Sequence, residues 1–268
     1  MIVDIHTHIF PPRLIAERAR LALADEAFGE MYTDPKAKMA TADDLLSSMA
    51  SAGVDVSVAG GFWWRDPILA AEHAAYLIEA ARRSGGRILA FVPGRAAVDG
   101  AAGIGEVRER SPEGVPDSTL PVLLHSSEEF GHAYRGKEGG LTPAALGRLL
   151  EARPAARLIA AHWGGGFPFA ALMPEMRALI ADRMLFDSAA SAYLYGPDIF
   201  RLVIDLVGLK SVAWGSDFPL RPQAVDRAYA EAAVPDAVEQ AAVLGGNAAR
   251  FLGLARSEWG QRATDRQG

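Results

Sequence analysis

The chain has 268 residues, of which 50% are hydrophobic and 22% are charged, and its formal net charge is −6. This length suits one (β/α)8 barrel, which typically takes ~250 residues, and the composition argues against disorder. The sequence has no cysteine, no lysine- or arginine-rich run and no apolar run of the ~20 residues that span a membrane, so we expect neither disulfides, nor nucleic-acid binding, nor membrane insertion. The absence of cysteine also fits a reducing cytoplasm, and the first residues lack the basic region of a signal peptide, so we expect a cytoplasmic protein.

Short apolar runs alternate with helical patterns along the chain. Residues 2–5 predict a buried strand, and residues 11–32 predict an alanine-rich helical excursion. Thr41, followed by acidic residues, predicts the N-cap of a helix that ends near Gly53, and residues 54–59 predict the next strand. The remaining strands are expected at residues 88–92, 104–107, 121–125, 158–162, 184–187 and 211–215, and the remaining helices at 66–83, 142–153, 169–181, 197–207 and onward to about 252.

Alternating strands and helices predict parallel strands, and we expect one (β/α)8 TIM barrel over residues 1–253, followed by a polar tail at 254–268. Only residues 108–120 separate the fourth and fifth strands, and they contain prolines and a glycine. A parallel crossover needs about a dozen residues or more. We therefore expect the fourth helix to be shortened or missing and the barrel to be distorted there.

Polar residues follow several of the predicted strands: His6 and His8 the first, His125 the fifth, His162 the sixth and Asp217 the eighth. In a barrel, the carboxyl ends of all strands meet on one face, where active sites lie. Residues i and i+2 of a strand point to the same side, so both imidazoles of the first strand can reach one ion. The alternative is that these are ordinary polar residues at loop starts, with Asp217 capping the next helix.

Five motifs occur in order, namely His6-Thr-His8, Pro121-Val-Leu-Leu-His125, Ala161-His162-Trp-Gly-Gly, Gly215-Ser-Asp217-Phe-Pro and Gly246-Asn-Ala-Ala-Arg-Phe. Together they resemble the amidohydrolase superfamily. The similarity is greatest to its amidohydrolase-related branch, which includes aminocarboxymuconate semialdehyde decarboxylase, and it spans residues 2 to about 253.

This resemblance implies that His6, His8, His125 and Asp217 hold a divalent metal, and that His162 and Asp217 are catalytic. No lysine ends the fourth strand, where Val107-Arg108-Glu109 stands, so a single metal ion is favoured. Histidine and carboxylate ligands suit Zn²⁺, with Mn²⁺ as an alternative.

The main functional prediction is a metal-dependent hydrolase for a small, carboxylate-bearing substrate, in which a bound ion acidifies water and Asp217 accepts the proton. Non-oxidative decarboxylation is the alternative reaction, with His162 assisting protonation of carbon. A non-catalytic barrel that binds metal or ligand is the third reading. Intact His162 and Asp217 argue against it.

The substrate and partner predictions rest on loop residues. Substrate contacts are expected from Arg65, His132, Arg135 and Trp163. The segments 32–38 and 134–137 are expected to arch over the site and to form a basic mouth. The aromatic run Phe62–Trp64 and the missing helix predict exposed apolar surface, and hence a homodimer.

Overall fold

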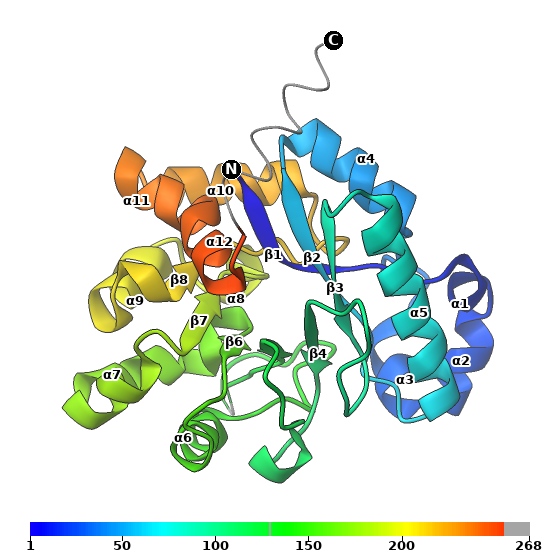
Figure 1. The fold of residues 1–268 in the computed structure, drawn as a ribbon, viewed down its shortest axis with the longest axis horizontal. Coiled ribbons are helices and arrows are strands. Elements are labelled where there is room, and N and C mark those ends of the chain that lie inside the picture. Colours follow the sequence, from blue (N-terminus) through cyan, green and yellow to red (C-terminus); the bar gives the residue numbers. More distant parts are fainter. Residues whose placement is uncertain (129, 255–268) are drawn as a thin grey trace.

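The computed structural model describes residues 1–128 and 130–254, which form a barrel of parallel strands inside a ring of helices (Figure 1). The eight strands pair in chain order, each with the next. Their bounds are β1 Val3–His8, β2 Val56–Gly60, β3 Ile88–Val92, β4 Gly103–Val107, β5 Val122–Leu124, β6 Leu158–Ala160, β7 Met184–Asp187 and β8 Val212–Ala213. The expected (β/α)8 fold is confirmed.

The barrel closes where the chain beyond β8 runs beside β1. The amide of Ile5 donates to Trp214 O at 3.1 Å, and the amide of Asp217 donates to His6 O at 2.9 Å. The amide of His8 donates to Phe218 O at 2.6 Å. Closure therefore brings the first and last strand ends into direct contact, and with them the polar residues that each strand carries.

The helices begin and end with the signals expected from the sequence. Thr41 and Asp44 form a capping box at the start of α4, and Gly53 ends that helix in a left-handed conformation. The α-helices are α1 Pro12–Ala16, α2 Arg18–Ala24, α3 Glu26–Tyr32, α4 Ala42–Ala52, α5 Pro67–Arg83, α6 Pro143–Ala152, α7 Pro174–Ile180, α8 Ser191–Leu194, α9 Ile199–Val207, α10 Gln223–Ala233, α11 Ala237–Ala241 and α12 Asn247–Leu252. Shorter turns are η1 Pro112–Gly114, η2 His162–Leu172, η3 Leu209–Ser211 and the π-helical η4 Ala242–Gly246.

Two crossovers of the barrel lack an α-helix. The connection from β4 to β5 holds only η1, as the prolines predicted, and the fully described connection from β3 to β4 holds no helix at all. Figure 1 shows the result, because loops and the short turn η1 stand between α5 and α6 where α-helices would cover the barrel wall. The expected distortion is therefore present, and it extends one crossover further than the sequence indicated.

The barrel interior is filled by apolar side chains from every strand except β4, as barrel interiors are generally filled by inward-pointing strand residues. Phe91 on β3 fills the space beside β4, where the next strand carries Gly103. A Cβ at Gly103 would lie 2.4 Å from the Phe91 ring, so only glycine fits there. A second cluster packs the outer strand faces against the helices and includes Trp163 and Trp214.

Two sequence predictions about this region were wrong. The helix expected at residues 169–181 is divided into the end of η2 and α7, because Met173 between them is extended and Pro174 starts a new helix. The aromatic run was expected to be exposed, but Phe62 and Trp64 are only 5% and 6% exposed. Both pack on Phe28, with the Trp64 ring stacked 4.8 Å from it.

Within the two described segments, no helix has the length and apolarity needed to cross a membrane. The predicted polar tail lies, from residue 255 onward, outside the described residues.

His73 on α5 provides a pH-sensitive contribution to stability. It is fully buried, with Nε2 2.7 Å from Ile9 O and with Nδ1 accepting from the Trp64 indole at 3.1 Å. Burial lowers the pKa of His73 to about 4. This lies below the unfolded value of ~6.5, so the unfolded chain binds more protons between these pH values, and stability falls as pH drops through that window.

We expect the free energy of unfolding to drop between pH 7 and pH 5 by about 2 kcal/mol more in the wild type than in a His73→Gln variant. Glutamine does not titrate but can still donate a hydrogen bond to Ile9 O. Urea unfolding of both proteins, with metal chelated, measures the difference. Equal losses in the two proteins would contradict this assignment.

Candidate metal centre

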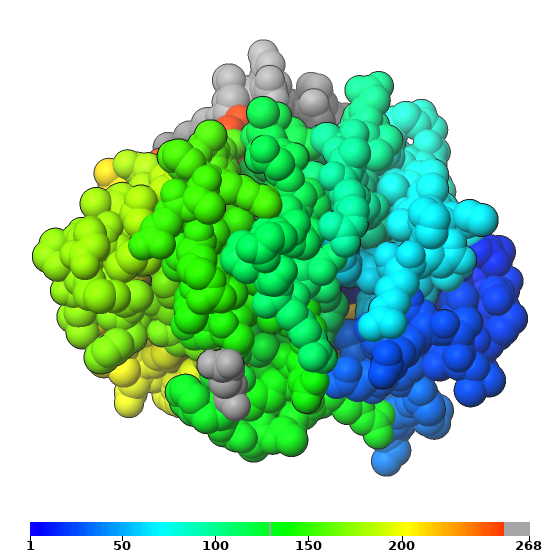
Figure 2. Space-filling model, turned by 90° about the horizontal axis from the view of Figure 1, so that it is seen from below, coloured from blue at the N-terminus to red at the C-terminus, as the bar shows by residue number. Residues whose placement is uncertain are grey.

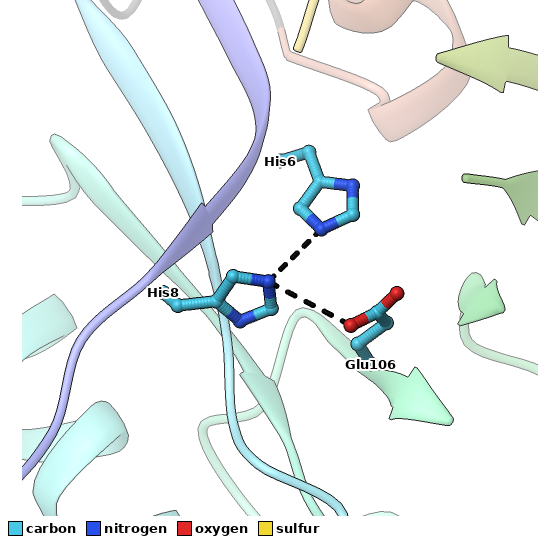
Figure 3. A group of neighbouring side chains, drawn as sticks. All are labelled: His6, His8 and Glu106. Carbon is cyan, nitrogen blue, oxygen red and sulfur yellow. Dashed lines mark hydrogen bonds and ion pairs between the residues drawn. The ribbon is translucent and has the colours of Figure 1, made fainter. Parts of the chain in front are cut away.

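The polar strand ends meet in one buried cluster at the carboxyl face of the barrel. Two overlapping groups have ligand atoms that all lie within 4.8 Å of one another. One group is His6, His8 and Glu106, and the other is Glu106, His125 and His162. Figure 3 shows the first group, with the imidazoles of β1 turned toward each other and toward the carboxylate from β4.

His6 and His8 present the same nitrogen to the cluster. His6 Nδ1 lies 2.8 Å from Asp187 Oδ2, and His8 Nδ1 lies 3.1 Å from Gly60 O. Both partners only accept, so each Nδ1 carries the proton and each neutral ring points a lone pair inward from Nε2. The two Nε2 atoms are 3.0 Å apart. Two lone pairs at this distance repel unless a proton or a cation lies between them, so the pair fits a bound metal ion.

The charges around His6 also favour a proton or a cation between the two Nε2 atoms. Burial opposes protonation of His6, but the charges of Asp187, Asp217 and Glu106 overcome it and raise the pKa of His6 to about 10. Without a metal, the cluster therefore holds a proton at neutral pH. A divalent ion that binds here must displace that proton, because a ligating imidazole is neutral.

Asp217, in the loop after β8, places its carboxylate beside the Nε2 atoms of His6 and His8. Its Oδ1 lies 3.5 Å from His8 Nε2 and 3.8 Å from His6 Nε2. Burial works against ionisation, but the hydrogen bond with His8 and the charge of His6 hold the pKa of Asp217 below its usual value, so it is a carboxylate at neutral pH. Its φ of 59° is rare for a residue with a side chain. Such strain is typical of functional positions.

Glu106, the fourth residue of β4, was missed by the sequence reasoning. It is 4% exposed and lies at the centre of the cluster, with Oε2 3.7 Å from His8 Nε2. Its Oε1 lies 2.8 Å from His125 Nδ1 and 3.8 Å from His162 Nε2. Burial alone would raise its pKa, but the contact with His125 and the charges of His6 and Arg108 hold it well below the usual value, so Glu106 is ionised.

His125 and His162 complete the second group. His162 is held by Nδ1, which lies 3.0 Å from Ala189 O, so Nε2 is left for the cluster. The His125 ring is 3% exposed, and its Nε2 has no hydrogen-bond partner among the described residues. A buried nitrogen of this kind is costly unless an ion or a ligand pairs with it or with its ring.

Asp187 at the end of β7 was also not predicted from the sequence, and it supports the cluster through hydrogen bonds to residues of two other elements. Besides His6 Nδ1, it accepts from the backbone amides of His162 at 2.9 Å and Ala189 at 3.0 Å. It is fully buried. One carboxylate therefore orients a ring from β1 and the turn after β6 together. The only sequence signal was a charged residue ending an otherwise apolar strand.

The expected substrate-contact residues are spread out. Trp163 is fully buried, and its indole donates to Ser191 Oγ at 2.7 Å. Arg65 is exposed, 3.6 Å from Glu26. His132 is exposed beside Tyr134. The substrate roles of these residues stay predictions.

The two loop segments expected to arch over the site do meet. Arg135 lies 3.0 Å from Asp34, and the amide of Gly136 donates to Glu30 at 3.0 Å. Lys137 lies 3.9 Å from Glu128. The basic side chains of residues 134–137 are therefore matched by acidic partners, which weakens the positive mouth that the sequence suggested.

A hollow of about 960 Å³ opens where the two crossovers lack helices, and its lining includes none of the cluster histidines, Glu106 or Asp217. Figure 2 shows it as the recess between the blue and cyan segments and the green loops after β3 and β4. Its walls include Trp63, Trp64 and Arg95. Arg108 lines it and also lies 3.7 Å from Glu106 Oε2. Arg108 therefore connects the hollow to the cluster.

Comparison with known protein families identifies the family of the chain. The family model described as amidohydrolase matches residues 117–254, which is more than half of the chain. The chain belongs to the amidohydrolase family. The expected superfamily is thereby confirmed, and with it the prediction of an amidohydrolase-superfamily enzyme. No curated protein matches the chain.

Solved structures share the fold over nearly the whole chain. A 2,6-dihydroxybenzoate decarboxylase from Rhizobium is 13% identical, with a TM-score of 0.68 over 94% of this chain and 98% of that one. A 5-carboxyvanillate decarboxylase from Novosphingobium aromaticivorans, complexed with manganese, is 12% identical, with a TM-score of 0.72 over 95% and 96%. An amidohydrolase from Burkholderia multivorans with bound zinc is 15% identical, with a TM-score of 0.64 over 95% and 100%.

Proposed function

We propose that this amidohydrolase is a metal-dependent carboxy-lyase that removes CO₂ from a small aromatic carboxylate. The observation that carries the proposal is the buried cluster of His6, His8 and Asp217, which presents converging lone pairs and a carboxylate at the mouth of the barrel. The fold supports it, because the chain is similar over nearly its whole length to two aromatic-acid decarboxylases. The sequence analysis gave hydrolysis as the main prediction and decarboxylation as the alternative reaction. The proposal reverses that order.

The reaction breaks the bond between the ring carbon and the carboxylate and forms a C–H bond with one proton. His6, His8 and Asp217 would hold a divalent ion, Zn²⁺ or Mn²⁺, which would supply positive charge to the substrate's oxygen atoms. His162 is the proposed proton donor to the ring carbon, because its Nδ1 is fixed by Ala189 O and its Nε2 faces the cluster. The hollow with Trp63 and Arg108 suits an aromatic anion, since guanidinium groups pair with carboxylates.

A second candidate function is hydrolysis, and Glu106 favours it. A further ionised carboxylate within the cluster can hold a second ion or orient a water molecule, neither of which decarboxylation requires. Asp217 would then accept the proton of the attacking water. The two reactions are separated by their products.

The test is a panel of hydroxybenzoates, esters and lactones assayed for CO₂ release and for acid release. Decarboxylation predicts CO₂ from hydroxybenzoates and no hydrolysis of the esters. Acid release from esters or lactones alone would replace the proposal with the second candidate. Metal binding without turnover of any compound would leave the non-catalytic reading.

Metal removal gives a further prediction. Dialysis against a chelator is expected to abolish turnover, and Zn²⁺ or Mn²⁺ is expected to restore it, because the cluster lacks its central charge without an ion. The far-ultraviolet circular dichroism should change little, since the barrel core does not involve the ligands. Full activity in metal-free protein, verified by elemental analysis, would contradict a metal-dependent reaction.

We also propose a homodimer in the cytoplasm. The zero cysteine count supports the location. The apolar surface that supports a dimer is not the aromatic run but residues of η2 and the start of α7, where Phe169, Leu172 and Met173 are 71%, 58% and 47% exposed. Light scattering at micromolar concentration tests the assembly, and a Phe169→Ser variant should shift it toward monomer.

A further inference from the structure

Asp4 on β1 is a fully buried carboxylate two residues before His6, and neither candidate reaction uses it. Its Oδ1 accepts from the backbone amides of Ser216 at 2.9 Å and of His6 at 3.2 Å. Its Oδ2 accepts from Ser216 Oγ at 2.5 Å and from Gln223 Nε2 at 2.7 Å. A buried carboxylate is costly unless donors surround it, and these neutral donors come from β1, the loop after β8 and α10.

We propose that Asp4 is a positioning residue of the metal centre, which holds Ser216 and thereby fixes the carboxylate of Asp217 beside His6 and His8. Both Asp4 oxygens are occupied by the donors just described, so Asp4 acts through the chain that carries Asp217 and not as a ligand. The inference rests on the metal site of the proposed function, but it is the same for either candidate reaction.

Hydrogen bonds hold the chain on both sides of Asp217. On one side, Ser216 is bound to Asp4 through its amide and through its hydroxyl. On the other side, the amide of Phe218 donates to Ser216 Oγ at 3.1 Å, so one hydroxyl links Asp4 to both neighbours of Asp217. Asp217 has a φ of 59°, and a conformation of this kind persists only where the surrounding structure holds it. Without the link from Asp4, we expect the carboxylate of Asp217 to move away from the two histidines.

The chain after β8 passes so close to β1 that a small shift changes the metal centre. A Cβ at Gly215 would lie 2.8 Å from the Cβ of His6 and 3.5 Å from the Cβ of Asp187. Ser216 and Asp217 follow directly from this contact. Because Asp217 Oδ1 lies 3.8 Å from His6 Nε2, a displacement of about 1 Å is enough to spoil its geometry as a ligand.

Gln223 at the start of α10 shows that the surroundings of Asp4 are arranged for a carboxylate. Its Nε2 donates to Asp4 Oδ2 at 2.7 Å and to Ser57 Oγ at 3.1 Å. Its Oε1 is buried and has no hydrogen-bond partner within residues 1–128 and 130–254. The reverse orientation of the amide would set Oε1 against a carboxylate oxygen, and both groups only accept. The unpartnered oxygen of Gln223 therefore follows from supplying Asp4 with a donor.

The test compares the Zn²⁺ affinity of Asp4→Asn, Ser216→Ala and the double variant with that of the wild type, by competition with a chelating dye. Asparagine is nearly isosteric with aspartate, but its NH2 group faces donors, which weakens the link to Ser216. We expect Asp4→Asn to bind Zn²⁺ about 10 times more weakly, the lower end of the effect of residues behind metal ligands, and Ser216→Ala to lose less. Because both residues act through one link, the double variant should lose about as much as Asp4→Asn alone.

The visible absorption of protein loaded with Co²⁺ is a readout that general destabilisation would not change, because its bands depend on ligand number and geometry. We expect Asp4→Asn and Ser216→Ala to shift these bands in the same direction. Asp25→Ala is the matched control, because Asp25 is also buried but caps α3, accepting from the amides of Phe28 at 3.0 Å and Arg65 at 3.3 Å. It should lower the melting temperature and leave the Zn²⁺ affinity and the Co²⁺ bands unchanged.

Wild-type affinity and wild-type bands in Asp4→Asn would overturn the inference and leave the proposed function standing. Losses that multiply in the double variant would also overturn it, since the two residues would then act separately. Failure of the wild type to bind Zn²⁺ or Co²⁺ would overturn both the inference and the proposed function. If Asp4→Asn does not fold, Ser216→Ala decides alone, because unchanged affinity and bands in that variant would remove the link.

Discussion

An Asp217→Asn variant is expected to turn over substrate about 10²–10⁴ times more slowly than the wild type while keeping its fold. The carboxylate lies within 3.8 Å of both inward-facing nitrogens of β1, and its pKa is held low, so it provides negative charge at the centre of the site. Asparagine has nearly the same shape but can neither balance a cation nor accept a proton. The loss is therefore a loss of charge and not of packing.

Steady-state kinetics, metal content and thermal unfolding of the variant measure this. Asp99→Asn is a suitable control, because Asp99 is exposed in the loop between β3 and β4. The Asp99→Asn variant should turn over substrate at the wild-type rate. Wild-type turnover in Asp217→Asn would remove Asp217 from the chemistry under either candidate reaction.

Asp217 and the histidines of β1 could be found from sequence because their signals are local. His6 and His8 are two residues apart on a clear strand, and Asp217 follows another strand in a motif of its own. Once a barrel is predicted, strand ends must converge, and no further information is needed to bring these residues together. The structure places them as that reasoning required.

Glu106 could not be found in the same way. The strand that carries it is short and rich in glycine, and the region around it had the weakest pattern in the chain. The absence of a lysine at the end of that strand favoured a single ion. The carboxylate that reaches the cluster lies inside the strand, and only the packing of β4 against β5 shows that it faces His125.

The turn after β6 shows a second limit of sequence reasoning. A helix was expected from residue 169, but the 3₁₀ turns of η2 run to Leu172 and the extended Met173 separates them from α7, which starts at Pro174. Residues 163–166 before them have left-handed backbone angles. Glycines permit such angles without requiring them. The conformation is set by the neighbouring loop after β5 and by the hydrogen bond from the Trp163 indole to Ser191, both distant in sequence.

An Asp187→Asn variant is expected to bind Zn²⁺ about 10–100 times more weakly than the wild type, the usual effect of removing a carboxylate that orients a ligating histidine. Asp187 fixes the tautomer of His6 by accepting from Nδ1 at 2.8 Å, and its charge makes the ring a stronger ligand. Asparagine can still accept from His6 Nδ1 through its oxygen, but its NH2 group then faces the backbone amides of His162 and Ala189, so the charge and part of the support behind the ring are lost together. A dissociation constant from competition with a chelating dye measures the change.

The control for that variant is Asp226→Asn. Asp226 is also buried, accepts from the Trp214 indole at 3.0 Å and pairs with Arg221, but it holds none of the cluster histidines. Its replacement should cost stability and leave Zn²⁺ affinity unchanged. If both variants weaken Zn²⁺ binding equally, the effect of Asp187 comes from general loosening of the barrel. If only Asp187→Asn weakens it, the charge behind His6 tunes the metal, and the strand end at β7 belongs to the active site although it touches no substrate.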